Sequence, residues 1–517
     1  MDQTKSIPKF YDGRSVLITG ATGFMGKVLV EKLLRSCPDV REIFVLMRPK
    51  KGLSIDNRVR QLLTLPLFDR LKKENPSVLD KVIPIEGDTI KEGLGIPDFE
   101  RKVLIERVSV VFHVAASVRF DDPLKTAVFT NTRSTRDMCI LAAQMKKLVI
   151  FMHVSTTYNQ ADKPVVEEKL YPCEVDWKKT IKIVETINEE LLKTFTPKYL
   201  GSFPNTYTFT KRMAEQVVSD YSHVIPAVVF RPSIVGLFQN FVLFLSVIAT
   251  MDEPMPGWVD NFNGPTGLMV GGGKGVLRTV YGDPQLRADF IPVDVAIKAM
   301  IIASWKRGIR TYFCLIDPSV HVYNCSSADM KNVSVEEIKR MALICASKNP
   351  LEGIIWAPSI TYTTNNLYYF ASVLLFHLLP GLVLDFILYL SGHKPMLVKL
   401  QRRVYIANTA LSYFLTHEWE FKNANLFGLL SEVSEADSKN FLFDFASIDV
   451  SYYFENCLIG AKKYLLNEKP TDSSVAKRHL TRMIWIDKIF KGLLLLFFIW
   501  ILYAFDFYSY VMNSVFI

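Results

Sequence analysis

Over roughly the first 345 residues, short runs of apolar side chains alternate with stretches whose apolar residues recur at helical spacing. The run at 16–18, for example, is followed by Val28, Leu29, Leu33 and Leu34, which lie on one face of a helix. Further runs that predict buried strands lie at 42–47, 81–88, 108–113, 148–154 and 226–231. This alternation predicts an α/β fold with a doubly wound parallel sheet.

The alternation stops after about residue 349, and long apolar helical patterns begin. We therefore predict an α/β domain at 1–345 and a mainly helical C-terminal domain at 346–475. The stretch 367–390 is strongly apolar, although His377 and Asp385 interrupt it and Pro380 with Gly381 splits it. It is compatible with a membrane-inserted hairpin, an interfacial helix or a buried lid. The cations that flank it are compatible with anionic headgroups, with ligand phosphates and with a solvated basic face: Lys394, Lys399, Arg402 and Arg403.

A second apolar stretch lies near the end of the chain. Residues 492–511 contain one charged side chain, Asp506, and are long enough to cross a bilayer as a helix. Cations precede the stretch, which places its N-terminal side in the cytosol. A buried core helix is the weaker alternative, because the stretch has no polar face. We predict a transmembrane tail anchor at 490–512, and no C-terminal tripeptide identifies the organelle.

The first predicted strand runs directly into a glycine-rich turn, which is followed by the first predicted helix. Gly20 suits a tight turn, Gly23 a close approach of the backbone to a pyrophosphate, and Gly26 close packing of helix on strand. The free N–H groups at the start of the helix would face the phosphates. The spacing of three and three after a threonine resembles the extended short-chain dehydrogenase/reductase family, with its Rossmann-like sheet. The predicted phosphate-binding residues are Thr19, Gly20, Thr22, Gly23, Phe24, Met25 and Gly26.

The second predicted strand ends in Arg48, where folds specific for NAD carry an acid that binds the ribose hydroxyls. A cation at this point suits the 2′-phosphate of NADPH, so we predict NADPH as the cofactor. An ordinary solvated charge after a strand is the alternative.

Further cofactor contacts follow from the resemblance and from the sheet edge. Asp88 stands where the resembled family caps the adenine amine, and Ala115 with Ala116 lets the backbone run along the nicotinamide ribose. Asn131 begins a helical pattern, and its amide either supports the site or caps the helix. Pro232 and Ser233, after the sixth strand, recur in extended members of the family and complete the predicted contacts.

The catalytic candidates are hydroxyl and amine side chains. Ser155 and Thr156 follow the fifth strand, at the edge where parallel sheets place ligands. Tyr207 and Lys211 are four residues apart, on one face of a helix. An ammonium beside a phenol lowers the pKa of the phenol, and the ammonium also holds ribose hydroxyls. An exposed Tyr and Lys that share a helix by chance are the alternative.

Composition narrows the classes of function. Among 517 residues, 49% are hydrophobic and the net charge is +9, with basic residues spread along the chain. This pattern favours anionic ligands and an anionic membrane surface over nucleic acid. The seven cysteines form no CxxC pair, which argues against a zinc site and a disulfide framework, so we predict no metal.

Taken together, these motifs resemble the alcohol-forming fatty acyl-CoA reductases over nearly the whole chain, including the male-sterility-type C-terminal domain. The resemblance rests on the glycine turn, Arg48, the segment 153–156, the Tyr207 and Lys211 pair, the segment 231–235 and the segment 256–265. It implies reduction of a long-chain acyl-CoA by NADPH to a primary alcohol, with release of CoA. It also implies an enzyme on the cytosolic face of peroxisomes or the endoplasmic reticulum, with peroxisomes favoured.

One segment departs from the family pattern: an apolar insert at 238–251. It either lines an acyl tunnel or reflects an unusual splice form or gene model. Two alternative functions also remain open. One is a reductase that stops at the aldehyde, and the other is a membrane-tethered NADPH-binding scaffold without turnover.

Overall fold

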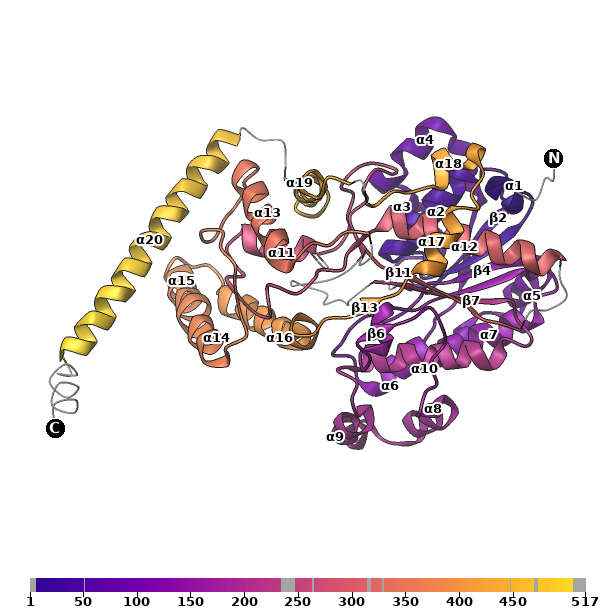
Figure 1. Cartoon of the computed structure of the whole chain (residues 1–517), viewed down its shortest axis with the longest axis horizontal. Coiled ribbons are helices and arrows are strands. Elements are labelled where there is room, and N and C mark those ends of the chain that lie inside the picture. Colours follow the sequence, from indigo (N-terminus) through magenta and orange to yellow (C-terminus); the bar gives the residue numbers. More distant parts are fainter. Residues whose placement is uncertain are drawn as a thin grey trace.

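The computed structural model describes residues 6–50, 52–233, 247–262, 265–313, 318–327, 330–446, 448–468 and 473–504. A seven-stranded parallel sheet forms the α/β half of the molecule, in the order β11-β7-β5-β4-β1-β2-β3 (Figure 1). The predicted doubly wound sheet is confirmed, and β11 is a seventh strand that the hydrophobic pattern did not predict. The strands are β1 (Ser15–Thr19), β2 (Glu42–Met47), β3 (Val82–Glu86), β4 (Val108–His113), β5 (Ile150–Val154), β7 (Ala227–Pro232) and β11 (His321–Cys325).

Helices cover both faces of this sheet because successive strand residues point to opposite sides. In β1, Val16 and Ile18 pack with α2 (Phe24–Ser36) and α12 (Val293–Phe313), whereas Leu17 packs with the layer of α7 (Ser134–Gln144) and α10 (Thr206–Tyr221). Both layers are almost fully buried, so the sheet edge is held rigidly. The other helices of this half are α1 (Ile7–Tyr11), α3 (Ile55–Leu63), α4 (Asp69–Glu74), α5 (Asp98–Arg107), α6 (Leu124–Ala127), α8 (Trp177–Thr186) and α9 (Glu189–Leu200).

The helix that precedes β5 does not begin at Asn131, as the pattern indicated. It starts at Leu124 with α6, passes through the π-helical segment η5 (Val128–Arg133) and continues as α7. Asn131 lies in the π-helical segment and is therefore not a helix cap.

The C-terminal half forms a second lobe around its own hydrophobic cluster. Two short parallel pairs tie distant segments together: β12 (Thr361–Thr363) with β9 (Thr279–Tyr281), and β10 (Ile291–Pro292) with β8 (Val247–Ile248). The lobe therefore takes residues from both sides of position 346. Its helices are α11 (Pro265–Gly273), α13 (Val335–Lys348), α14 (Asn366–Ser372), α15 (Leu379–Leu390), α16 (Leu397–Leu415) and α19 (Val450–Gly460).

The chain then returns to the α/β half. Helices α17 (Ala424–Leu430) and α18 (Glu435–Phe441) pack against α12, and α17 also contacts β11. The adjoining strand β13 (Glu420–Phe421) pairs with β6 (Val165–Val166). At the end of this return, the Asp437 carboxylate accepts a hydrogen bond of 2.8 Å from the backbone N–H of Ile7.

The apolar stretch at 367–390 is one helix of 25 residues, Asn366–Leu390. Pro380 does not split it, contrary to the expectation from sequence. The π-helical segment η7 (Val373–Leu378) lies just before Pro380 and widens the hydrogen-bond pattern there, so the helix continues although proline has no N–H to donate. Among the described residues this is the one helix long and apolar enough to cross a membrane. It suggests association with membranes.

The predicted tail anchor falls partly outside the described residues. Its described part belongs to α20 (Ser473–Ala504), which projects from the C-terminal lobe at the end where α14 and α15 lie (Figure 1). Most of the predicted insert at 238–251 also lies outside the described residues. Within the rest of it, Val247 and Ile248 form β8.

Candidate active site

The glycine turn brings three elements so close together that side chains would not fit. Gly20 has a φ of +75°, and a Cβ there would lie 2.7 Å from the backbone nitrogen of Ala115. A Cβ on Gly26 would lie 2.2 Å from the Gly20 carbonyl oxygen. The turn therefore packs against the segment after β4 on one side and under α2 on the other.

The N-terminus of α2 is open to a ligand. Gly23 is its N-cap residue and offers no side chain to the N–H groups of the first turn. Beside it, the ring of Phe24 stacks on Trp258 at 5.5 Å, and Lys27 forms an ion pair with Asp260. The loop at 256–262, which carries part of the predicted family pattern, is thus fixed against this end of the helix.

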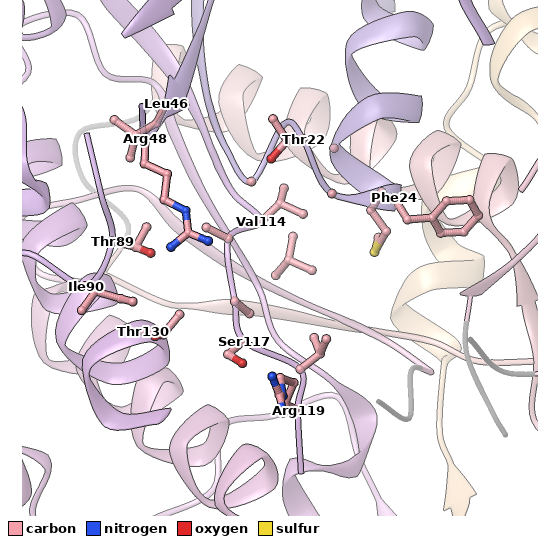
Figure 2. A pocket seen from close by; sticks show the side chains of 18 of the residues that line it. Thr22, Phe24, Leu46, Arg48, Thr89, Ile90, Val114, Ser117, Arg119 and Thr130 are labelled. Carbon is pink, nitrogen blue, oxygen red and sulfur yellow. The ribbon is translucent and has the colours of Figure 1, made fainter. Parts of the chain in front are cut away.

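A cleft of about 600 Å³ runs along the carboxyl edge of the sheet in front of this turn (Figure 2). It brings together most of the residues predicted from sequence. Those that line it are Gly20, Thr22, Gly23, Phe24, Met25, Gly26, Arg48, Asp88, Ala115, Ala116, Ser155, Tyr207 and Lys211.

Two cations stand at the end of β2. The Arg48 side chain reaches into the cleft, toward the level of Thr89 in Figure 2, and the Arg58 guanidinium donates a hydrogen bond to the Arg48 carbonyl. Arg58 also lines the cleft but was missed by sequence reasoning, because it comes from α3 and belongs to no motif. Asp88 completes this wall, and its Oδ1 accepts a hydrogen bond of 3.0 Å from the N–H of Ile90.

Tyr207 and Lys211 occupy the opposite part of the cleft, on α10. The Lys211 Nζ donates to the carbonyl of Val154, at 2.7 Å, which ties the lysine to the end of β5. Burial lowers the pKa of Lys211 to about 7, against the influence of Glu215. The Thr156 side chain hydrogen bonds to the Tyr207 phenol. Thr156 itself is fully buried and is absent from the cleft wall.

The expected lowering of the Tyr207 pKa by Lys211 is not what the structure shows. Burial raises the pKa of the phenol, and the hydrogen bond from Thr156 only partly opposes this. The desolvation of the charged form outweighs the other influences on this side chain. A phenol that keeps its proton is suited to donate it.

Besides Thr156, four predicted residues are buried and do not line the cleft: Thr19, Asn131, Pro232 and Ser233. The Asn131 Oδ1 accepts a hydrogen bond of 2.8 Å from the Ser117 N–H, and its Nδ2 donates to the Ser117 carbonyl at 3.0 Å. The Nδ2 also donates to the Thr210 hydroxyl at 2.9 Å. It thus ties the segment after β4 to the residue next to Lys211. The Thr19 hydroxyl accepts from the Ala115 N–H at 3.2 Å.

Two histidines that sequence reasoning missed lie under Lys211. His113 and His153 are register partners on β4 and β5, and their rings are 5.6 Å apart. Burial lowers the pKa of His113 to about 3, and that of His153 is also lowered, with Lys211 adding to both effects. Their position follows from strand alternation, but nothing in the sequence separates them from ordinary core residues.

The arrangement fits a phosphorylated dinucleotide. Its parts are a glycine-rich turn, an uncapped helix N-terminus, two arginines near the end of the second strand, and a cleft whose wall also includes Tyr207 and Lys211. Among the described residues, no group of three or more His, Cys, Asp or Glu side chains is placed to hold a metal ion.

A parallel sheet with a glycine turn, and a Tyr and a Lys on the wall of the same cleft, is the arrangement of an extended short-chain dehydrogenase/reductase. Two family profiles, both described as male sterility protein, match the chain: an NAD-binding profile at 18–300 and a sterility profile at 376–468. The chain belongs to the fatty acyl-CoA reductase family of male-sterility proteins.

Curated relatives cover nearly the whole chain. Fatty acyl-CoA reductase 1 of Homo sapiens is 37% identical over 92% of this chain and 90% of its own length, and fatty acyl-CoA reductase 2 of Bos taurus is 37% identical over 95% and 92%. The terminal R domain of a myxalamid biosynthetic pathway aligns with a TM-score of 0.54 over 89% of this chain and 93% of its own, at 15% identity. That likeness concerns the fold.

Proposed function

We propose that this protein uses NADPH to reduce the thioester of a long-chain acyl-CoA to a primary alcohol, with release of CoA. The observation that carries the proposal is that Tyr207 and Lys211 line the same cleft as the glycine turn. Membership of the fatty acyl-CoA reductase family supports the acyl-CoA substrate.

The residues that would hold the cofactor follow from the cleft. The turn from Gly20 to Gly26 and the start of α2 receive the pyrophosphate, Arg48 and Arg58 the 2′-phosphate, and Asp88 the adenine. The backbone at Ala115 and Ala116 borders the nicotinamide ribose. When bound, NADPH supplies the hydride. The two arginines are the reason to propose NADPH and not NADH, because a 2′-phosphate needs positive charge nearby.

The side chains of the chain supply protons and hold the substrate oxygen. Tyr207, with the Thr156 hydroxyl behind it, donates a hydrogen bond to the carbonyl oxygen and stabilises the negative charge that develops there. Loss of CoA thiolate from the first reduction product leaves an aldehyde. In the second reduction Tyr207 gives its proton to the alkoxide, and Lys211 holds the ribose hydroxyls and stabilises the phenolate that is left. Ser155, on the cleft wall, is the second hydroxyl available to the substrate oxygen.

Counting products tests the reaction directly. The full chain in membranes is supplied with NADPH and palmitoyl-CoA, and NADPH oxidised is compared with free thiol released. A ratio of two with hexadecanol as product supports the proposal. A ratio of one with an accumulated aldehyde favours the reductase that stops at the aldehyde. If NADPH is not oxidised with any acyl-CoA, from medium to very long chains, the result favours the membrane-tethered NADPH-binding scaffold without turnover.

We further propose that residues 490–512, whose described part is the end of α20, are a tail anchor that holds the cleft on the cytosolic side. The support is that its apolar side chains from Leu493 to Tyr503 are mostly exposed to solvent, which is unfavourable in water. Of the two organelles the peroxisome is favoured over the endoplasmic reticulum, and fluorescence imaging of the tagged chain with markers for both decides between them. The division into domains at 1–345 and 346–475 stays a prediction.

A further inference from the structure

Helix Asn366–Leu390 has one face fixed to the C-terminal lobe. Its buried residues recur along one side, and the polar ones act as attachment points. His377 Nε2 accepts a hydrogen bond of 3.0 Å from the Thr279 N–H, on strand β9. The Asp385 carboxylate accepts from three backbone N–H groups at the start of α16, each at 2.8 Å. The two residues that interrupt the apolar pattern thus serve protein contacts.

The opposite face of the same helix is apolar and uncovered. Leu367 is 80% exposed, Phe386 62% and Leu390 68%. Scattered apolar residues on a surface are ordinary, but a continuous face of this length marks an interaction surface. The large exposed side chains on this face are Leu367, Phe370, Leu374, Leu379, Leu382, Val383, Phe386, Ile387 and Leu390.

The two ends of the helix are held on one side of it. Strand β12, which precedes the helix, pairs with β9, and α16, which follows it, packs back along α15. The Asn408 amide on α16 donates to the Tyr369 hydroxyl at 3.0 Å and to the Thr279 carbonyl at 3.4 Å. With 25 residues the helix is about 37 Å long and could reach across a bilayer, but its buried side would then pull the lobe into the hydrocarbon.

The exposed charges next to the helix in the sequence, from 364 to 417, are all positive. Between residues 364 and 417 the one carboxylate is Asp385, which is buried and occupied by the α16 N–H groups. Lys394, Lys399, Arg402 and Arg403 follow the helix and are all exposed. A surface of apolar side chains bordered by cations is complementary to anionic phospholipid. A second copy of this surface would bring like charges together.

We propose that helix Asn366–Leu390 lies in the plane of the membrane, with its exposed face in the headgroup and upper acyl region of an anionic bilayer. It is a second membrane contact beside α20. Arg278 links the two, since its guanidinium donates to Asp487 of α20 at 2.6 Å and to the Phe376 carbonyl at 3.3 Å. The proposal does not depend on turnover, so it can fail while the reductase proposal stands.

Depth measurements test it on the full chain. Single cysteines replace Leu374, Leu382 or Leu390, and each is labelled with a fluorophore after reconstitution into phosphatidylcholine–phosphatidylserine vesicles. Lipids that carry a nitroxide at the headgroup or at a chosen acyl carbon quench the fluorophore, and a comparison of the two reports how deep the fluorophore lies in the bilayer. Five of the native cysteines are buried, and the unmutated chain gives the labelling background. Phe99→Cys on α5, at a side chain that is 77% exposed, is the matched control.

We expect the three positions to be quenched at one shallow depth, at least about twofold more than the Phe99 control. Substituting Gln for Lys399, Arg402 and Arg403 should weaken quenching in vesicles with phosphatidylserine and leave it unchanged in pure phosphatidylcholine. A depth that changes steadily from Leu374 to Leu390 would mean a crossing helix and overturns the proposal. Absence of quenching by the lipid nitroxides also overturns it. So does self-quenching of the fluorophores without lipid quenching, because it would mean that the face packs against a second copy.

A measurement without any variant guards against misfolded mutants. Trypsin cleavage after Lys399, Arg402 and Arg403 is followed in the unmutated chain, in vesicles and in detergent. Protection by anionic vesicles that is lost at high salt supports an in-plane helix, because headgroup contacts are screened by salt. Equal cleavage in detergent, neutral vesicles and anionic vesicles contradicts it.

Discussion

The two halves of this protein use similar apolar residues in opposite ways. In α2, Val28, Leu29, Leu33 and Leu34 are almost completely buried between the sheet and its covering helices. In α15, Phe386 and Leu390 keep more than half of their surface exposed. Helical spacing of apolar residues predicted α2, and continuous apolar content predicted the stretch that contains α15, but neither signal reveals what covers the apolar face. The position of the polar residues reveals which face of a helix is attached to the protein.

Polar residues mark this difference. In the α/β half they form a buried network around the cleft, as with Asn131, Ser117 and Thr210. In the C-terminal lobe His377 and Asp385 attach a helix by the side opposite to its apolar face. The first arrangement fixes a site precisely enough for chemistry, and the second orients a surface.

Tyr207→Phe should give the largest effect and should be confined to the α/β half. Removal of the proton donor is expected to lower alcohol formation by about 10²–10⁴-fold. NADPH binding, followed by its fluorescence, and lipid quenching at Leu382 should stay unchanged. Undiminished turnover would remove Tyr207 from the mechanism.

Gly26→Ala should abolish cofactor binding, because its Cβ would meet the Gly20 carbonyl oxygen at 2.2 Å and the Ala21 Cα at 2.7 Å, so the backbone of the turn would have to shift. The expected result is loss of the rise in melting temperature that NADPH gives to the unmutated chain. Gly428→Ala on α17 is the matched control, since a Cβ there meets nothing within 4 Å. Retained stabilisation by NADPH in the Gly26 variant would contradict the close packing.

Arg48→Gln should weaken NADPH binding by about tenfold and leave NADH binding nearly unchanged, because it removes one charged contact to the 2′-phosphate. Titrations with both cofactors measure this. Lys50→Gln is the control, since Lys50 is exposed and stands off the cleft wall. Equal losses for the two cofactors would show that Arg48 acts on the fold instead of on the phosphate.

The stability of the cofactor-free protein should rise between pH 7 and pH 8. Burial lowers the pKa of Lys211 to about 7 and that of Lys32 to about 8, so in this range the unfolded chain holds protons on these two lysines that the folded chain has begun to lose. Nearer pH 9 the rise should end, because burial raises the pKa of cysteines such as Cys37 and Cys139 in the folded chain, and the unfolded chain then loses protons that the folded chain keeps. Lys211→Met should reduce the slope without abolishing it, because Lys32 remains. Denaturant unfolding at several pH values measures this, and Lys193→Met, at an exposed lysine on α9, should leave the slope intact.

Asp487→Asn should give the smallest effect on turnover and act on the C-terminal lobe alone. It removes the charged partner of Arg278, which is 5% exposed, at an expected cost of about 1–3 kcal/mol in local stability. Proteolysis within α20 should become faster, while NADPH affinity should not change. A large loss of cofactor affinity would show that the two halves are coupled.

Local patterns in the sequence predicted the glycine turn, six strands and the placement of Tyr207 and Lys211, because these depend on spacing within one segment. Arg58 and the histidine pair were missed because they approach the cleft from other elements. The π-helical segments η5 and η7 were missed as well, so the cap considered for Asn131 and the break expected at Pro380 were wrong. The rise in the Tyr207 pKa depends on how tightly distant segments enclose it, and no local pattern contains that information.

The return of α17 and α18 to the sheet has a consequence for biosynthesis. The Asp437 carboxylate accepts a hydrogen bond from the Ile7 N–H, and α17 packs on β11. The first and last parts of the α/β half therefore contact each other although more than four hundred residues are synthesised between them. While the ribosome makes the intervening lobe, α12 lacks its cover and presents apolar surface. The nascent chain therefore needs shielding until translation has passed α18, and messages that end before this point should yield chains destined for degradation.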